Sequence, residues 1–217
     1  MILSRVGPRP VLIEAFPVLG IAIGAAIILG VLGYWWLSGI AIFLTLFVLW
    51  FFRNPERMIP SGQGEVVSPA DGRVVEISKV YEDHLLQSET IKIGIFMSPL
   101  DVHVNRIPYE GKIVTIRHQP GKFLSAFKPN APLENEQNAV LLETPGGQRM
   151  LFVQIAGLLA RRIVYWVHEG EQVQRGQRFG MIKFGSRVDL YLPLDAKVFV
   201  KMSDRVKAGK TRVGVIP

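Results

Sequence analysis

The chain has 217 residues, a formal net charge of +7 and no cysteine. The absence of cysteine excludes disulfide scaffolds and metal sites built on thiolates. Arg5 and Arg9 against Glu14 give residues 1–52 a net charge of +1, so the remaining +6 belongs to residues 53–217. A basic surface fits nucleic acid or an anionic membrane, and the hydrophobic segment beside it favours the membrane and no nucleic acid.

The hydrophobic segment at residues 15–52 contains no charged residue. As one helix it would be roughly 57 Å long, against about 30 Å for the hydrocarbon core of a bilayer. Its length therefore suits two passes, which we expect at residues 16–32 and 34–52 with a reversal at Gly33. The alternatives are a cleaved signal peptide, for which the segment is too long, and a buried helical pair, which is rare for apolar runs of this length.

Both flanks of the segment are basic, whereas the expected turn between the helices carries no charge. The flanking residues are Arg5, Arg9, Arg53 and Arg57. The positive-inside rule places such flanks in the cytoplasm. The sequence therefore predicts a membrane-anchoring helical hairpin at residues 1–52, attached to the cell (inner) membrane, followed by a cytoplasmic domain at residues 53–217.

Short β-branched runs, cut by Gly, Pro and Asp, follow a turn-rich linker. They lie at residues 72–77, 91–96, 111–116, 139–143 and 150–155. Runs of this length and composition at close spacing are typical of strands. We therefore expect a mostly β (α+β) protein whose strand-rich domain follows the N-terminal hydrophobic helical hairpin.

The glycine-rich stretch at residues 167–192 resembles the barrel-sandwich pattern of biotinyl and lipoyl domains. In those carriers a lysine occupies a hairpin tip, whereas here the tip is Phe184-Gly185-Ser186-Arg187. The stretch thus predicts a barrel-sandwich-like domain, and the missing lysine counts against a carrier function.

Four short segments contain the residues best suited to chemistry. In chain order they are Ser68-Pro69-Ala70-Asp71-Gly72, residues 97–108 with the sequence Met-Ser-Pro-Leu-Asp-Val-His-Val-Asn-Arg-Ile-Pro, Gly121-Lys122-Phe123, and Phe184-Gly185-Ser186-Arg187. Each is weak alone, because Gly-Ser and Asp-Gly pairs are usually turns, and a histidine in a strand-like run fits a core position. Together and in this order they resemble the phosphatidylserine decarboxylase family, in its short bacterial and archaeal-type branch.

The resemblance implies a pyruvoyl-dependent enzyme whose catalytic domain, residues 53–217, cuts itself between Gly185 and Ser186. Ser186 Oγ would attack the carbonyl of Gly185, and β-elimination from the resulting ester would leave dehydroalanine, which loses ammonia to become the covalent pyruvoyl cofactor. This ketone would form a Schiff base with phosphatidylserine and yield phosphatidylethanolamine. No metal is expected. The implied partners are the phospholipid substrate, the membrane and the enzyme's own short chain, residues 186–217.

A serine hydroxyl is a poor nucleophile without a base. His103 is the candidate base and the later proton donor, and Asp71 is the candidate group that orients its imidazole. Gly185 leaves the attacked carbonyl uncrowded. His118 is the alternative base.

Lys122 and Phe123 resemble the substrate-side loop of the family and are the predicted substrate-binding residues. Arg106 is a departure, because the longer branch of the family has a second histidine there. Exposed sheet edges in a β-rich domain also favour a homodimer. Three alternatives stay open on the sequence: a membrane-tethered carrier or adaptor, a membrane-bound β-rich peptidase, and a decarboxylase of an ether-linked serine phospholipid.

Overall fold

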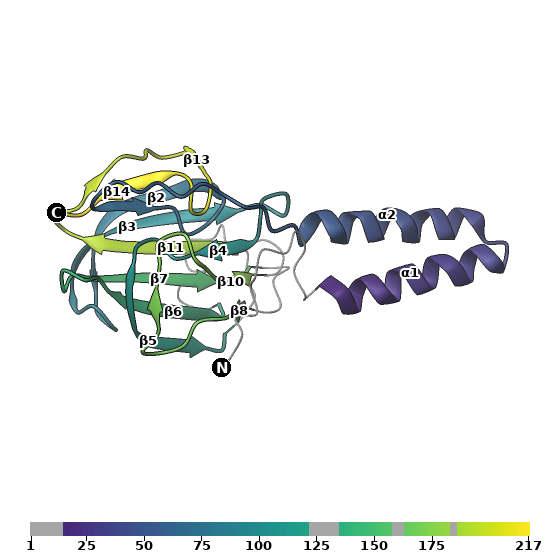
Figure 1. The fold of residues 1–217 in the computed structure, drawn as a ribbon, viewed down its shortest axis with the longest axis horizontal. Helices are drawn as coiled ribbons and strands as arrows, with labels where there is room; N and C mark the ends of the chain where they lie inside the picture. The colour runs from purple at the N-terminus through teal and green to yellow at the C-terminus, as the bar shows by residue number, and fades with distance from the viewer. Residues whose placement is uncertain (1–14, 122–134, 158–162, 183–185) are drawn as a thin grey trace. The chain divides into compact units, whose positions relative to one another are not determined.

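The computed structural model describes residues 15–121, 135–157, 163–182 and 186–217. The chain divides into two compact units, with the boundary between Glu56 and Arg57. The first unit holds two helices and the second holds the strands (Figure 1). The protein is therefore mostly β with an N-terminal helical hairpin, as the sequence predicts.

The helical unit consists of α1 (Phe16–Val31) and α2 (Trp35–Phe51). The reversal falls at Gly33, whose φ of +80° is a left-handed conformation that glycine adopts without a side-chain penalty. Both helices lie within the segments predicted from the sequence. α1 has 16 residues and α2 has 17, so each helix is slightly shorter than predicted.

The structure differs from the sequence-based expectation of two membrane passes. In the part of the chain that the structure describes, no helix is both long enough and apolar enough to cross a bilayer.

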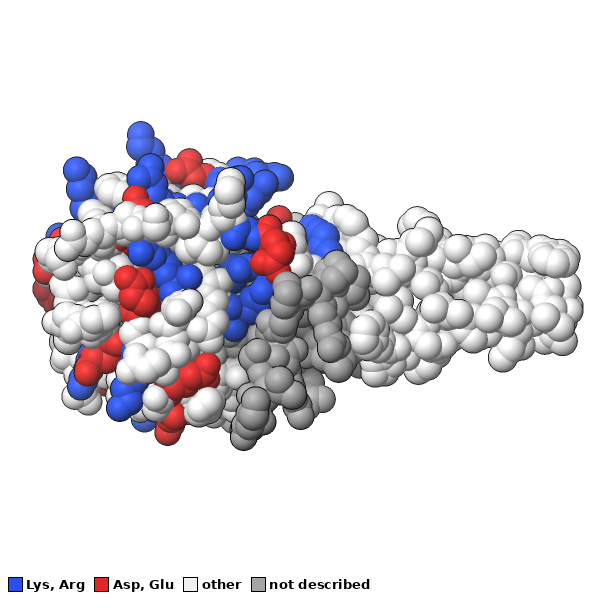
Figure 2. Space-filling view, viewed as in Figure 1, with Lys and Arg blue, Asp and Glu red and all other residues white. Residues whose placement is uncertain are grey.

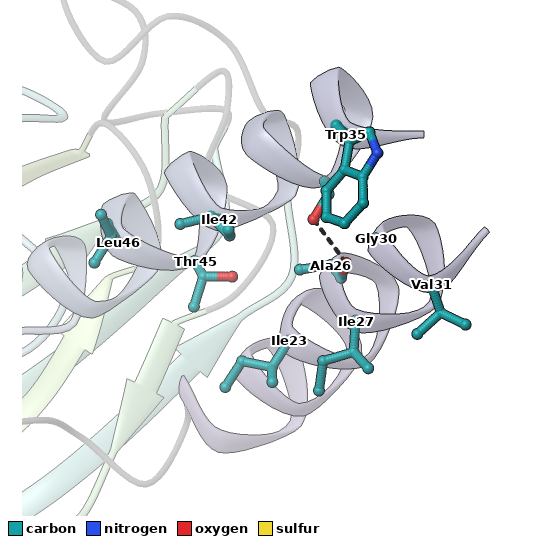
Figure 3. Close-up of a pocket in the computed structure, with 10 residues that line it drawn as sticks. Ile23, Ala26, Ile27, Gly30, Val31, Trp35, Ile42, Thr45 and Leu46 are labelled. Atoms are coloured by element: carbon teal, nitrogen blue, oxygen red, sulfur yellow. Dashed lines mark hydrogen bonds between the residues drawn. The ribbon is translucent and has the colours of Figure 1, made fainter. Parts of the chain in front are cut away.

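The surface of the hairpin is almost entirely apolar. Side chains from both helices, among them Ile27 and Trp35, line a groove of about 520 Å³ (Figure 3). The hydroxyls in the groove are used within the hairpin: Ser38 Oγ donates to the carbonyl of Ala26, the dashed line in Figure 3, and Thr45 Oγ1 donates within its own helix. Figure 2 shows both helices in white, whereas Lys, Arg, Asp and Glu are spread over the strand-rich unit.

The strand-rich unit is built on a curled eight-stranded antiparallel sheet with the order β13-β2-β3-β11-β7-β6-β5-β9 (Figure 1). Its strands are β2 (Gly72–Glu82), β3 (Ser88–Met97), β5 (Gly111–Gln119), β6 (Gln137–Glu143), β7 (Arg149–Ile155), β9 (Gln172–Val173), β11 (Ser186–Pro193) and β13 (Arg205–Val206). The five β-branched runs of the sequence lie in β2, β3, β5, β6 and β7, so these predictions are confirmed.

Two three-stranded sheets accompany the large one. The first has the order β1-β14-β12 and the second the order β4-β10-β8. Their strands are β1 (Glu65–Val67), β4 (Val104–Arg106), β8 (Ile163–Tyr165), β10 (Arg178–Ile182), β12 (Lys197–Val198) and β14 (Arg212–Val215). Phe152 of β7 meets Phe179 of β10 edge to face, with 4.8 Å between the ring centroids. The main hydrophobic core therefore joins the large sheet to the β4-β10-β8 sheet.

Strand β11 occupies the middle of the large sheet. It pairs with β3 along its whole length and with β7 over residues 187–191. Val188, Leu190 and Leu192 are buried in the main core. Because side chains alternate along a strand, Arg187 and Asp189 point to the opposite face. Residues 186–217 thus supply a central strand of the fold together with β12, β13 and β14.

Candidate active site

Ser186 is the first residue of β11 and follows residues 183–185, which lie outside the described part of the chain. It is fully buried, and its Oγ donates to Sδ of its cross-strand neighbour Met97 over 3.3 Å. A thioether is a weak acceptor, so no strong base holds the hydroxyl proton in this contact. The predicted nucleophile is therefore fixed by strand pairing, while its proton remains available to an approaching base.

His103 lies just before β4 and is also buried. Its Nδ1 is 2.9 Å from the carbonyl oxygen of Asp101, which assigns the proton to Nδ1 and makes Nε2 the basic nitrogen. The carbonyl of His103 accepts a hydrogen bond of 3.4 Å from the N–H of Ile182, four residues before Ser186. Backbone pairing thus brings His103 to the segment that leads into Ser186.

Residues 98–101 form a short turn, called the 98–101 turn below. It connects β3, the strand beside Ser186, to His103. Its ends are joined twice, because the N–H of Ser98 donates to Oδ2 of Asp101 over 2.8 Å and the N–H of Asp101 donates to the carbonyl of Ser98 over 3.0 Å. The turn follows Met97 directly, and its last residue supplies the carbonyl that orients the imidazole. Met97 and His103 are therefore held by one compact segment.

Asp71 has other partners than His103. Its carboxylate accepts two hydrogen bonds from the guanidinium of Arg57, of 2.5 and 2.8 Å, and a third of 2.8 Å from the N–H of Ala208. Both side chains of this ion pair are nearly buried. The contacts described for Asp71 are therefore with Arg57 and Ala208, and the contact described for the imidazole of His103 is with a backbone carbonyl, so the role of Asp71 in orienting the ring stays a prediction.

A chain of buried side-chain amides, which the sequence analysis did not identify, extends from Met97 into the sheet. Asn105 Nδ2 donates to Met97 Sδ over 3.6 Å, Gln154 Nε2 donates to Asn105 Oδ1 over 2.8 Å, and Asn138 Nδ2 donates to Gln154 Oε1 over 3.0 Å. All three amides are fully buried. Buried amides cost free energy unless they bond to one another, so this network specifies how β4 lies against β6 and β7.

Arg187, the residue after Ser186, belongs to a charged cluster on the opposite face of the sheet. Its guanidinium bonds Glu76, and its Nε donates to Asp189 Oδ1 over 2.5 Å. Lys92 Nζ lies 3.2 Å from Asp189 and 3.3 Å from Glu76. Gly94 provides the space, because a Cβ there would lie 2.4 Å from Arg187 Nη2.

Arg187 and Glu76 of this cluster keep their charges. Burial disfavours the charged form of Arg187, but Asp189 and Glu76 outweigh burial and raise the pKa of Arg187. Burial also acts to raise the pKa of Glu76, but hydrogen bonds from Arg187 and Ser78 and the charge of Lys92 outweigh it and lower that pKa. Arg187 and Glu76 therefore stay ionised at neutral pH and hold the start of β11 in place.

The other histidines lie towards the surface. His118 is on β5; its ring is partly exposed, and its Nε2 is 3.0 Å from Glu136 Oε1. His84 and His168 are exposed and lie beside carboxylates. None of the contacts described for these three rings involves Ser186.

Arg106, at the position where the longer branch has a histidine, is buried and donates to the carbonyl of Gly176 over 2.8 Å. Gly185, Lys122 and Phe123 lie outside the described residues. Within the described ranges, no group of three or more His, Asp or Glu side chains is placed to hold a metal ion.

Comparison with known proteins identifies the family of the chain. The sequence profile of the family described as "Phosphatidylserine decarboxylase" matches residues 44–214. A "Phosphatidylserine decarboxylase proenzyme" of Geotalea uraniireducens is 45% identical over 208 residues, which cover 96% of this chain and 97% of the relative. Proteins of the same name from Syntrophus aciditrophicus and Nitrosomonas europaea are 47% and 46% identical, covering 82% and 94% of this chain and 84% and 94% of their own. The chain belongs to the phosphatidylserine decarboxylase family.

Proposed function

We propose that the chain is the precursor of a pyruvoyl-dependent decarboxylase that converts phosphatidylserine to phosphatidylethanolamine. The observation that carries this proposal is the buried hydroxyl of Ser186, which follows a glycine, begins the central strand and donates to a thioether. The relatives, named as decarboxylase proenzymes, support both the reaction and a precursor that must be processed.

The proposed processing uses the residues of the chain itself. His103 Nε2 takes the hydroxyl proton as Ser186 Oγ bonds to the carbonyl carbon of Gly185, and the peptide C–N bond breaks as the proton passes to the departing amine. Loss of the Cα proton of residue 186 then breaks the Cβ–O bond, which frees the carboxylate of Gly185. The dehydroalanine that remains takes up water and loses ammonia, giving a ketone at position 186.

The surroundings of position 186 fit a pyruvoyl group. The site faces the thioether of Met97 and the apolar core, which suits a methyl ketone. Removing the hydroxyl deprives Met97 of a donor but leaves no buried donor unpaired, so the change carries no large desolvation penalty. A pyruvoyl group supplies an electrophilic ketone that takes up the substrate amine and draws electrons as CO₂ leaves. His103 would then deliver the proton that replaces the carboxylate.

A carrier, an adaptor or a peptidase has less support. The modified residue of a carrier must be exposed at a hairpin tip, and the relatives are named as decarboxylase proenzymes, not as peptidases. Ser186 is fully buried and lies between β3 and β7. Its burial fits a nucleophile that acts on its own backbone.

The proposed function predicts a defined pattern of inactivation. Purified full-length protein is expected to release CO₂ from phosphatidylserine and to lose this activity with hydroxylamine, or with borohydride in the presence of substrate, because both reagents trap a ketone or its imine. Metal chelators should leave the rate unchanged. Lipid mass spectrometry with ester- and ether-linked substrates measures the product of each. Full activity after borohydride treatment with substrate would exclude pyruvoyl chemistry.

We further propose that the α1–α2 hairpin attaches the enzyme to the cytoplasmic face of the cell membrane, with both of its ends on one side. Ile21, Trp35 and Phe43 are 77%, 75% and 68% exposed, respectively. Apolar surface left in water costs about 25 cal/mol per Å², and contiguous patches of it mark interaction sites. A phospholipid substrate makes the bilayer the natural partner for this surface.

Charges placed on the hairpin test this attachment. The double substitution Ile27→Asp with Phe43→Asp is expected to release the full-length protein from vesicles, because each charge costs about 2.5–3.5 kcal/mol in the hydrocarbon. Tyr81→Asp is the matched control, since Tyr81 is also exposed but lies on β2. Flotation with phospholipid vesicles gives the bound fraction. Equal retention of the double variant and the control would rule out the hairpin as the anchor.

A further inference from the structure

Two arginines face each other directly at one edge of the large sheet. Arg205 of β13 is the register partner of Arg73 of β2, and both side chains are exposed. Directly opposed residues of an antiparallel pair have Cβ atoms about 5 Å apart, and like charges there are destabilising. Neither guanidinium pairs with a carboxylate in the described parts of the chain; the contact described for Arg73 is a hydrogen bond of 3.0 Å to the carbonyl of Ser203.

The opposition of the two arginines is enforced by the backbone. The N–H of Ser203 donates to the carbonyl of Val74 over 2.8 Å, and the N–H of Val74 donates to the carbonyl of Asp204 over 3.0 Å. Ser203 has a φ of +72°, which is uncommon for a residue other than glycine. The turn before β13 is thus held against β2 in a costly conformation that keeps Arg205 opposite Arg73.

The two arginines line one pocket of about 400 Å³ with Ser98, Asp101 and Met202. Ser98 Oγ accepts the N–H of Leu100, which leaves the hydroxyl hydrogen to donate outward. One oxygen of Asp101 is already used by the N–H of Ser98. These side chains carry a formal net charge of +1.

This set of groups suits a phosphate. Guanidinium groups bind phosphate oxygens with paired, charge-assisted hydrogen bonds, and an anion between the two arginines would remove their mutual repulsion. The rim of the pocket indicates which phosphate it takes. Met202, which lines the pocket, is 55% exposed, and Leu100, which lies between Ser98 and Asp101 in the chain, is 66% exposed. Apolar side chains beside basic ones are typical of surfaces that enter a lipid headgroup layer.

The pocket lies on the opposite face of the sheet from the Ser186 hydroxyl. Arg73 is in register with Phe96, and Phe96 with Arg187, whereas Ser186 is in register with Met97. Since neighbouring residues of a strand point to opposite faces, the row that contains Arg73 faces away from Ser186 Oγ. A lipid bound by Arg73 is therefore not the one whose amine reaches position 186.

We propose that the Arg73–Arg205 pocket binds the phosphodiester of a second, non-reacting membrane phospholipid and so docks this edge of the sheet on the lipid surface. The proposal does not depend on the decarboxylation, because it concerns a different face and a different lipid. Because Ser98 and Asp101 line the pocket, a docked lipid would lie beside the 98–101 turn, whose last residue orients His103 through its backbone carbonyl.

Binding of a short-chain lipid to the full-length protein in detergent tests the pocket. Dihexanoyl phosphatidylglycerol has the phosphodiester but no amine, so it cannot react at position 186. Calorimetric titration is expected to show binding that weakens at least tenfold in Arg73→Gln and in Arg205→Gln, with no change in Arg117→Gln. Arg117 is an exposed arginine at the far side of the same sheet, on β5. Equal affinity of the wild type and both pocket variants would overturn the proposal.

Two further measurements test whether the bound phosphate belongs to a lipid or is a free anion, and whether Arg73 and Arg205 repel each other. Inorganic phosphate should bind more weakly than the lipid, and Met202→Ser should weaken the binding of the lipid but not of phosphate. If inorganic phosphate bound as tightly as the lipid, the ligand would be a free anion and the docking role would be overturned. Arg205→Glu should abolish binding while raising the melting temperature, because it turns a repulsive cross-strand pair into an attractive one. A lower melting temperature in that variant would contradict the repulsion on which the proposal rests.

Discussion

The Ser186→Ala protein is expected to remain a single chain of 217 residues, whereas the wild type is expected to separate into residues 1–185 and 186–217. The substitution removes the only atom of the side chain that can attack the carbonyl of Gly185, and the methyl group of alanine cannot replace it. Loss of self-cleavage should therefore be complete on the time scale of purification. Intact-mass analysis measures it, and the short wild-type fragment should resist Edman degradation because it has no free α-amine.

Ser88→Ala is the control for this experiment. Ser88 is exposed and begins β3, the strand that pairs with β11, so its loss tests a serine on the same pair of strands without touching the reacting atoms. This variant is expected to process like the wild type. Cleavage of the Ser186→Ala chain at the same bond would assign the nucleophile to another group.

The second large effect is expected on the rate of self-cleavage when His103 is replaced. His103→Gln keeps a side chain of similar size but no basic nitrogen, and the loss of one general base typically slows a reaction by about 10²–10⁴-fold. The unprocessed chain should therefore accumulate and convert slowly. Time courses of cleavage by mass spectrometry give the rate, and circular dichroism checks that the variant is folded.

Two further variants separate the alternatives for the base. His118→Gln is expected to cleave at the wild-type rate, because His118 is partly exposed and bonds Glu136. Asp71→Asn would leave the buried Arg57 without its ion-pair partner, which typically costs about 3–5 kcal/mol of stability. If Asp71 acts through Arg57, thermal stability falls while cleavage at low temperature persists. Normal processing of His103→Gln together with failure of His118→Gln would move the base to His118.

Periodicity and composition could predict the long strands of the fold but not the short strands that complete its sheets. The runs in β2, β3, β5, β6 and β7 are apolar and β-branched, so each can be recognised as a strand from its own residues. The short strands β4, β9 and β13 are set by partners far away in the chain, as in the pairing of Arg205 with Arg73. Strand β11 is not among the predicted runs, because Arg187 and Asp189 interrupt its apolar pattern. These residues are tolerated there through ion pairs with Glu76 and Lys92.

The site shows the same division between local signals and tertiary partners. Ser186 and His103 were proposed from their motifs and stay candidates, whereas the ion pair of Asp71 with Arg57 was not foreseen, because Arg57 lies outside the segments that suggested chemistry. The amide chain left one local signal, Gln154 in an otherwise apolar run. Nothing near Gln154 in the sequence predicts that it bonds Asn105 and Asn138, since those contacts exist only after three strands have come together.

The position of β11 changes what unfolding would mean for the processed enzyme. Before the cut, this strand belongs to a continuous chain, and unfolding is a unimolecular event. After the proposed cut, the middle of the sheet would be supplied by a separate polypeptide, held by pairing with β3 and β7. Recovery from heat would then require two chains to meet, so it would depend on protein concentration and compete with aggregation. The active form would persist through slow dissociation of its fragments, a kinetic lifetime in place of an equilibrium stability.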